Sequence, residues 1–250
     1  MVTDLGTADQ QFAVPDQDLR WRVTGADYSA DDFRRSGRDS LDDLQRALRY
    51  PDLELSGFSR ALDFGCGCGR VVRHLSKVSE VVELHGCDTD GAAIAWAEQH
   101  LPFARFVHND ALPPLPYADG TFDLVMNHSV FTHLPEDYQD AWLAELRRVA
   151  APGGWVLLTV AGLHAFDGLV QAWREWPADP SGLVATMESR GFLHITDDSW
   201  TVSSFPDWYH SSFHSPSYVL RHWAEFFTVV GYFPRGALSF QDAVLLRRDA

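Results

Sequence analysis

The segment that most constrains this chain is Ala61–Leu75. A short apolar run ends in Asp63, three glycines follow at every second position, and apolar residues then recur at helical spacing. Glycine is needed where the backbone must turn sharply or lie directly against a ligand, because a Cβ would block both. The pattern therefore predicts a strand, a tight ligand-holding loop and a helix.

Two common glycine loops do not match this segment. The dinucleotide fingerprint requires a small residue three positions after Gly67, where this chain has Arg70. A phosphate-binding P-loop would need Gly-Lys followed by Ser or Thr, which is absent. The pattern that does fit is D-x-G-x-G-x-G.

Further strands follow at regular intervals, and several end in polar residues. Residues 81–88 read as a strand ending in Asp88, 25 positions after Asp63. Residues 105–108 precede Asp110 and Ala111, residues 122–128 end in Asn127 and His128, and residues 155–160 form a continuous apolar run. Helices are predicted for 91–100 and 136–150, so the order is that of an open, mostly parallel α/β sheet. Such sheets bind ligands at the carboxyl ends of their strands.

Together these five segments, spanning residues 61–160, resemble class I S-adenosylmethionine-dependent methyltransferases. The resemblance implies an α/β Rossmann-like seven-stranded doubly wound sheet, with helices on both faces and the antiparallel seventh strand inserted between the fifth and the sixth. It implies S-adenosylmethionine as cofactor and S-adenosylhomocysteine as product. We expect Asp88 to bind the ribose hydroxyls, and the whole expected cofactor set is Asp63, Gly65, Cys66, Gly67, Asp88, Thr89, Asp110, Ala111, Asn127, Ser36 and Gly37.

The chain on either side of these segments predicts two additions. Residues 1–50 are expected to form an N-terminal arm and helices that close on the cofactor site, with 1–25 a mobile arm and Ser36-Gly37 in a turn between two helices; a plain interhelical turn is the alternative. Residues 51–250 are expected to form the methyltransferase domain. Within it, residues 163–215 are an aromatic-rich insertion after strand five, interpreted as a substrate-side lid or pocket, or else as a packed extension with its own small core.

A general base would assist methyl transfer to a hydroxyl but is unnecessary for an unprotonated amine. The catalytic candidates are His214, His128, His210 and Tyr209, with His214 favoured because it precedes a predicted helix beside the expected pocket. His133 is interpreted as structural. No metal site is expected, since Cys66, Cys68 and Cys87 lack metal-ligand spacing.

Composition limits the partners. The net charge of −15 disfavours nucleic acid and anionic membranes. The N-terminus lacks the features of a signal peptide, so cytoplasm is the expected location. We expect a small-molecule biosynthesis enzyme that methylates a partly apolar acceptor at N, O or C. The alternatives are a nicotinamide-dependent oxidoreductase, which Arg70 disfavours, and a non-catalytic cofactor-binding scaffold.

Overall fold

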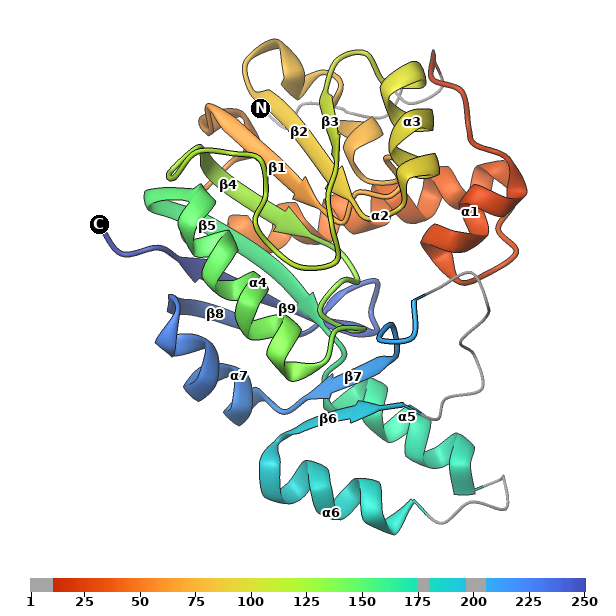
Figure 1. Ribbon diagram of the computed structural model, residues 1–250, viewed down its shortest axis with the longest axis vertical. Coiled ribbons are helices and arrows are strands. Elements are labelled where there is room, and N and C mark those ends of the chain that lie inside the picture. The colour runs from red at the N-terminus through yellow and green to blue at the C-terminus, as the bar shows by residue number, and fades with distance from the viewer. Residues whose placement is uncertain (1–10, 175–179, 197–205) are drawn as a thin grey trace.

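The computed structural model describes residues 11–174, 180–196 and 206–250. Its centre is a seven-stranded sheet in the order β3-β2-β1-β4-β5-β9-β8 (Figure 1). The strands are β1 (Arg60–Phe64), β2 (Glu83–Asp88), β3 (Arg105–His108), β4 (Phe122–Asn127), β5 (Ala150–Val160), β8 (Thr228–Ala237) and β9 (Gln241–Arg247). This is the predicted class I arrangement, with the last strand between the fifth and sixth strands of the sheet.

The last strand runs opposite to its neighbours. Strands β1 to β5 pair in parallel, whereas β9 pairs antiparallel with both β5 and β8. The β5–β9 register runs from Trp155 opposite Arg247 to Val160 opposite Asp242. The start of β9 therefore lies at the same edge of the sheet as the carboxyl end of β5.

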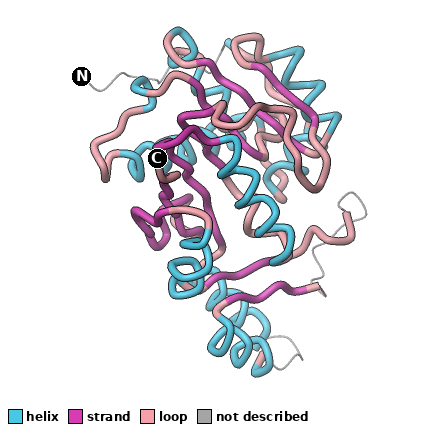
Figure 2. The backbone as a smooth tube through the Cα atoms, turned by 60° about the vertical axis from the view of Figure 1, so that its left-hand side comes forward, coloured by secondary structure: helices cyan, strands magenta, loops and turns pink. Residues whose placement is uncertain are grey.

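Helices cover both faces of the sheet, as expected (Figure 2). On one face, Trp142 and Leu146 of α4 (Glu136–Val149) share a core with Val219 of α7 (Pro216–His222). On the other face, α2 (Ala30–Leu48) and α3 (Gly91–His100) pack their apolar sides on the sheet. The central strands are thus buried on both sides, which explains their continuous apolar runs.

The helix starts follow from local side chains. Ser29 and Asp32 form a reciprocal capping box at α2, and the Asp90 side chain accepts hydrogen bonds from the first backbone N–H groups of α3. Ser215 caps α7 by accepting a hydrogen bond from Tyr218 N–H. Pro216 follows at a first-turn position, as the sequence predicts.

The prediction of an α-helix directly after the glycine loop is wrong. The chain instead forms two short 3₁₀ turns, η3 (Val72–Leu75) and η4 (Val78–Glu80). Gly69 lies in the left-handed region at φ 77°, and the buried side chains of Arg70 and Arg73 occupy the space against α2. A longer α-helix is therefore replaced by tighter turns. Two further 3₁₀ turns are η2 (Leu55–Gly57) and η5 (Trp223–Glu225).

The N-terminal region also differs from the prediction. Residues 17–24 are not an unstructured arm but helix α1 (Gln17–Thr24), capped by Asp16 and ended by Gly25 at φ 65°. The expected turn at Ser36-Gly37 is absent, because α2 continues through it. The Ser36 hydroxyl donates to the Phe33 carbonyl at 3.1 Å, so the serine is accommodated inside the helix.

Between β5 and α7 the chain forms a separate unit, low in Figure 1. It consists of α5 (Leu163–Arg174), α6 (Ser181–Arg190) and the antiparallel pair β6 (Phe192–Ile195) and β7 (Ser211–His214). Phe166, Met187 and Phe213 belong to its own small core. Of the aromatic residues that suggested a lid, Trp176, Trp200 and Phe205 lie outside the described residues.

Candidate functional site

A cavity of about 750 Å³ lies at the carboxyl edge of the sheet. Its walls are the ends of β1 to β4, the end of α1, residues 206–211 and the start of β9. The residues that line the cavity include the acids predicted at strand ends, the glycine loop and two of the four catalytic candidates, His128 and Tyr209.

Asp63, at the end of β1, is 3% exposed, and its Oδ2 atom has no hydrogen-bond partner among the described residues. Burial raises its pKa to about 7, the Arg70 guanidinium opposes that rise, and the nearby Asp88 carboxylate adds to it. A carboxylate in this position would be stabilised by a cationic ligand group.

The glycine loop is folded against the end of β2. The N–H groups of Gly65 and Cys66 both donate to the Cys87 carbonyl, at 2.8 and 3.0 Å. Gly67 N–H donates to Asp88 Oδ2 at 2.7 Å. Gly65 and Gly67 have φ of 78° and 53°, a region that favours glycine. The loop conformation thus depends on these glycines and on the Asp88 carboxylate.

Asp88 lies at the end of β2 and borders the cavity. Its second oxygen, Oδ1, accepts a hydrogen bond from Asp90 N–H at 2.8 Å. Burial raises its pKa, although the backbone N–H bonds oppose that rise. Exposed Thr89 and Asp110 and the half-buried Ala111 complete this side of the cavity. The resemblance predicts all three as cofactor-binding residues, and all three line the cavity.

Arg70 is a site residue that the sequence reading used only to reject a motif. Its buried side chain borders the cavity and donates from Nη1 to the Ser36 carbonyl at 3.0 Å and to Ser40 Oγ at 2.8 Å. Helix α2 therefore holds a cation close to Asp63. Ser36 and Gly37 contact Arg70 but do not themselves line the cavity.

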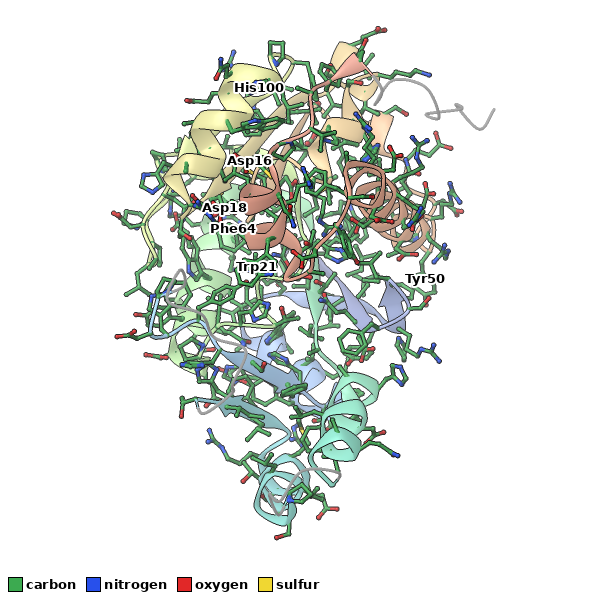
Figure 3. The ribbon with its side chains drawn as sticks, turned by 90° about the vertical axis from the view of Figure 1, so that its right-hand side faces the viewer. Asp16, Asp18, Trp21, Tyr50, Phe64 and His100 are labelled. Atoms are coloured by element: carbon green, nitrogen blue, oxygen red, sulfur yellow. The ribbon has the colours of Figure 1, made fainter. Side chains whose placement is uncertain are left out.

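Helix α1 forms a wall of the cavity that sequence reasoning missed. Figure 3 shows the side chains of Asp18 and Trp21 on this helix. Arg22 bridges to Asp90 at 3.1 Å and also pairs with Asp18. A Cβ on Gly67 would lie 2.5 Å from Val23 Cγ2, so α1 is packed directly on the loop. Two residues in the sequence mark this helix: Asp16 as its N-cap and Gly25 at its C-terminal end.

The other half of the cavity is formed by the end of β4 and the start of β9. His128 is 7% exposed, and burial together with the Arg70 cation lowers its pKa well below the usual value. Ser129 has an unusual φ of 65°, with its N–H donating to Thr159 Oγ1 at 2.8 Å. Gln241 donates from Nε2 to Ser129 Oγ at 2.7 Å. Neither Ser129 nor Gln241 was predicted as a site residue.

Aromatic side chains from the 206–211 segment close this half. Tyr209 lines the cavity and stacks on His133, with ring centroids 4.3 Å apart, and burial and Asp88 raise its pKa. Trp208 and Trp142 line the same cavity. His133, interpreted as structural from the sequence, therefore both borders the cavity and braces Tyr209.

Three predicted residues have other surroundings. His214, the favoured base, is fully buried away from the cavity, where its Nε2 bonds Gln139 Oε1 at 2.8 Å and burial lowers its pKa to about 3. The His210 ring packs near His194 and is not among the lining residues. Asn127 bridges strands, donating to the Phe64 carbonyl at 3.2 Å and accepting from Thr159 N–H at 3.3 Å.

Residues 11–174, 180–196 and 206–250 contain no cluster of three His, Cys, Asp or Glu side chains arranged to hold a metal ion. Within the same ranges, no helix combines the length and apolarity needed to cross a bilayer.

Residues 62–158 match the model of a family described as a methyltransferase domain. A phthiotriol/phenolphthiotriol dimycocerosates methyltransferase from Mycobacterium ulcerans is 31% identical over 147 residues, covering 58% of this chain and 50% of the relative. A malonyl-[acyl-carrier protein] O-methyltransferase from Halorhodospira halophila is 34% identical over 119 residues, covering 46% and 39%. The chain spans about half or less of these relatives' length.

Solved structures agree with the fold. The magnesium protoporphyrin IX methyltransferase from Synechocystis, crystallised with S-adenosylhomocysteine, matches with a TM-score of 0.60 and 15% identity over 92% of this chain and 93% of its own. A protein from Pyrococcus horikoshii matches with a TM-score of 0.59 and 19% identity, covering 85% and 91%. The sheet order, the glycine loop between two strand-end acids and the matched family model identify residues 62–158 as a methyltransferase domain, in a chain with the class I methyltransferase fold.

Proposed function

We propose that this protein transfers the methyl group of S-adenosylmethionine to a small molecule and releases S-adenosylhomocysteine. The observation that carries the proposal is the pairing of Asp63 and Asp88 around the glycine loop in one cavity. These two acids offer negative charge and hydrogen-bond acceptors to a ligand that has an ammonium group and ribose hydroxyls.

The residues present fit this cofactor. Asp63 Oδ2 is buried without a partner among the described residues and suits the ammonium of the methionine moiety. Asp88 accepts hydrogen bonds from Gly67 N–H and Asp90 N–H, and its carboxylate has further lone pairs that suit ribose hydroxyls. Asp110 and the Ala111 backbone would meet the adenine at the rim.

The cofactor supplies an already activated methyl group, so the protein's task is alignment and exclusion of water. Holding two reactants in line contributes roughly 7–11 kcal/mol in well-ordered cases. Here α1 covers the glycine loop through Val23, and Trp208 and Tyr209 wall the opposite side. These contacts would orient both partners and shield them from solvent.

The cavity fits a small, partly apolar acceptor. Its volume of about 750 Å³ lies in the range of small-ligand sites. Apolar side chains line it beside the polar groups, including Phe64, Val130, Leu134, Trp142 and Trp208. The net charge of −15 opposes a nucleic-acid substrate.

Isothermal titration calorimetry with S-adenosylhomocysteine tests the proposal, with NAD as the comparison ligand. We expect S-adenosylhomocysteine to bind and NAD not to bind. Asp88→Ala should weaken binding about tenfold or more, since hydrogen bonds to a charged group are worth about 1.5–3 kcal/mol. Exposed Asp39→Asn is the matched control and should leave affinity unchanged. Binding of NAD alone would refute the assignment.

A further inference from the structure

The half of the cavity formed by β4 and β9 has a different chemistry from the half around Asp63. The carboxylates that line the described cavity are Asp63, Asp88, Asp90 and Asp110, and all four lie at the carboxyl ends of β1, β2 or β3 or just after them. The β4–β9 half presents His128, Ser129 and Gln241 together with aromatic rings. A cationic amine would find no carboxylate partner there, so this half favours a neutral acceptor.

Gln241 is held so that its carbonyl oxygen remains available. Its Nε2 donates to Ser129 Oγ at 2.7 Å, while its buried Oε1 has no partner among the described residues. Ser129 is fixed in turn by the bond from its N–H to Thr159 Oγ1. A residue other than glycine at φ 65° carries backbone strain, which this network sustains. Buried acceptors of this kind are normally satisfied, which indicates a ligand donor.

His128 presents a second unsatisfied acceptor. Its side chain is more than nine-tenths buried and borders the cavity, and neither ring nitrogen has a hydrogen-bond partner among the described residues. Burial, with the nearby Arg70 cation adding to it, lowers the pKa of His128 well below its usual value, so the ring is neutral. A neutral imidazole has one nitrogen that accepts a proton or hydrogen bond.

Resting on the proposed function, we propose that the methyl acceptor is a hydroxylated aromatic compound with two hydrogen-bond donors. Its reacting hydroxyl donates to His128, and its second donor, another hydroxyl, binds Gln241 Oε1. The planar ring packs beside Trp208 and the Tyr209–His133 stack.

The chemistry balances with S-adenosylmethionine as the methyl donor. The acceptor oxygen forms a bond to the methyl carbon as the carbon–sulfur bond breaks, and that bond's electron pair stays on sulfur. The hydroxyl proton passes to His128 and from there to solvent. The products are an aryl methyl ether, S-adenosylhomocysteine and a proton.

The first test measures binding of naphthalene, 2-naphthol and the 2,3- and 2,7-dihydroxynaphthalenes to protein saturated with S-adenosylhomocysteine. We expect 2-naphthol to bind about tenfold tighter than naphthalene, and the better dihydroxy isomer about tenfold tighter again, as one buried hydrogen bond each would give. Equal affinities, or no binding of any probe, would overturn the proposal. Saturation is measured first, so failure of the cofactor assignment is recognised separately.

Substitutions show which residue accounts for the gain in affinity from each hydroxyl group. Gln241→Leu should abolish the gain from the second hydroxyl and keep that from the first, while the exposed Gln99→Leu control changes neither. Ser129→Gly tolerates the same φ but removes the partner of Gln241, so it should lose part of the second gain. If both cavity variants retain the full gain, Gln241 does not bind the acceptor.

His128 is tested by ring ¹⁵N NMR and by turnover. In the wild type its signals should report a neutral ring from pH 6 to 8 and shift when 2-naphthol binds. His128→Phe should lose the gain from the first hydroxyl, because phenylalanine has no hydrogen-bond acceptor. His128→Gln and His128→Phe should both lower 2-methoxynaphthalene formation from S-adenosylmethionine at least 100-fold, the low end of general-base effects of about 10²–10⁴-fold. An unshifted ring or unchanged turnover would overturn its role.

Discussion

Replacing Asp63 by Asn should stabilise the free protein while weakening cofactor binding. In the folded chain, burial raises the Asp63 pKa to about 7, against 3.8 for an exposed aspartate. Between these two values the folded state holds a proton that the unfolded state has released. The free energy of unfolding therefore falls as pH rises from about 4 to about 7, and it levels off above that.

The structure sets the size of both effects. A pKa of about 7 in place of 3.8 corresponds to about 4 kcal/mol, since each pKa unit is worth about 1.4 kcal/mol. Asn cannot ionise, so Asp63→Asn should gain up to about 4 kcal/mol of stability at pH 8 and little at pH 4. S-adenosylhomocysteine should bind about 10- to 100-fold more weakly to the variant at pH 8, because a charge-assisted bond to its ammonium is lost.

Two assays check this reasoning. Urea unfolding of both proteins at pH 4 and pH 8 gives the stability difference, and calorimetric titration gives the affinity. Wild-type affinity for S-adenosylhomocysteine should drop about tenfold from pH 8 to pH 6 as Asp63 takes up its proton, whereas the variant's affinity should stay flat. A variant that is less stable than the wild type at pH 8, or that binds equally well, would contradict the placement of Asp63.

Three further predictions concern the loop, α1 and β7. Gly65→Ala would place a Cβ against the Val130 side chain at φ 78°. It should lower the free energy of unfolding by more than about 1 kcal/mol and impair S-adenosylhomocysteine binding. The control Gly168→Ala in α5, where the added Cβ meets open space, should slightly raise the free energy of unfolding in urea. Arg22→Gln should change the free energy of unfolding by about 1 kcal/mol or less, because the Arg22–Asp90 pair is partly exposed. The same variant should speed ligand dissociation in stopped-flow measurements, because α1 loses its ion pair to Asp90. His214→Gln should leave ligand affinity intact. Since the pKa of His214 is lowered to about 3 by burial, wild-type stability should fall as pH drops below about 6.5, and it should fall less steeply in this variant.

The sequence predicted the sheet well because its central strands are buried on both faces. Continuous apolar runs such as Trp155–Val160 mark such strands with little ambiguity. Asp63 and Asp88 could be placed because the carboxyl ends of parallel strands meet at one edge, as the β1–β2 register confirms. The roles assigned to the individual side chains remain predictions.

The remaining site residues depend on contacts between distant segments. His214 was expected beside the pocket, just before a helix, but pairing of β6 with β7 buries it beside Gln139, 75 positions earlier. Gln241 meets Ser129 across 112 positions, through the reversal of β9. Periodicity and motif spacing report only local order, so neither contact could be read from the sequence.

The reversed direction of β9 also decides where the chain leaves the fold. Gln241 opens the strand beside the cavity, and Arg247 closes it at the opposite edge of the sheet, roughly 20 Å away at about 3.3 Å per residue. Whatever is joined after Ala250 therefore emerges on the side remote from bound ligands. An affinity tag, a surface linker or a fluorescent reporter attached there should not block entry of ligands into the cavity.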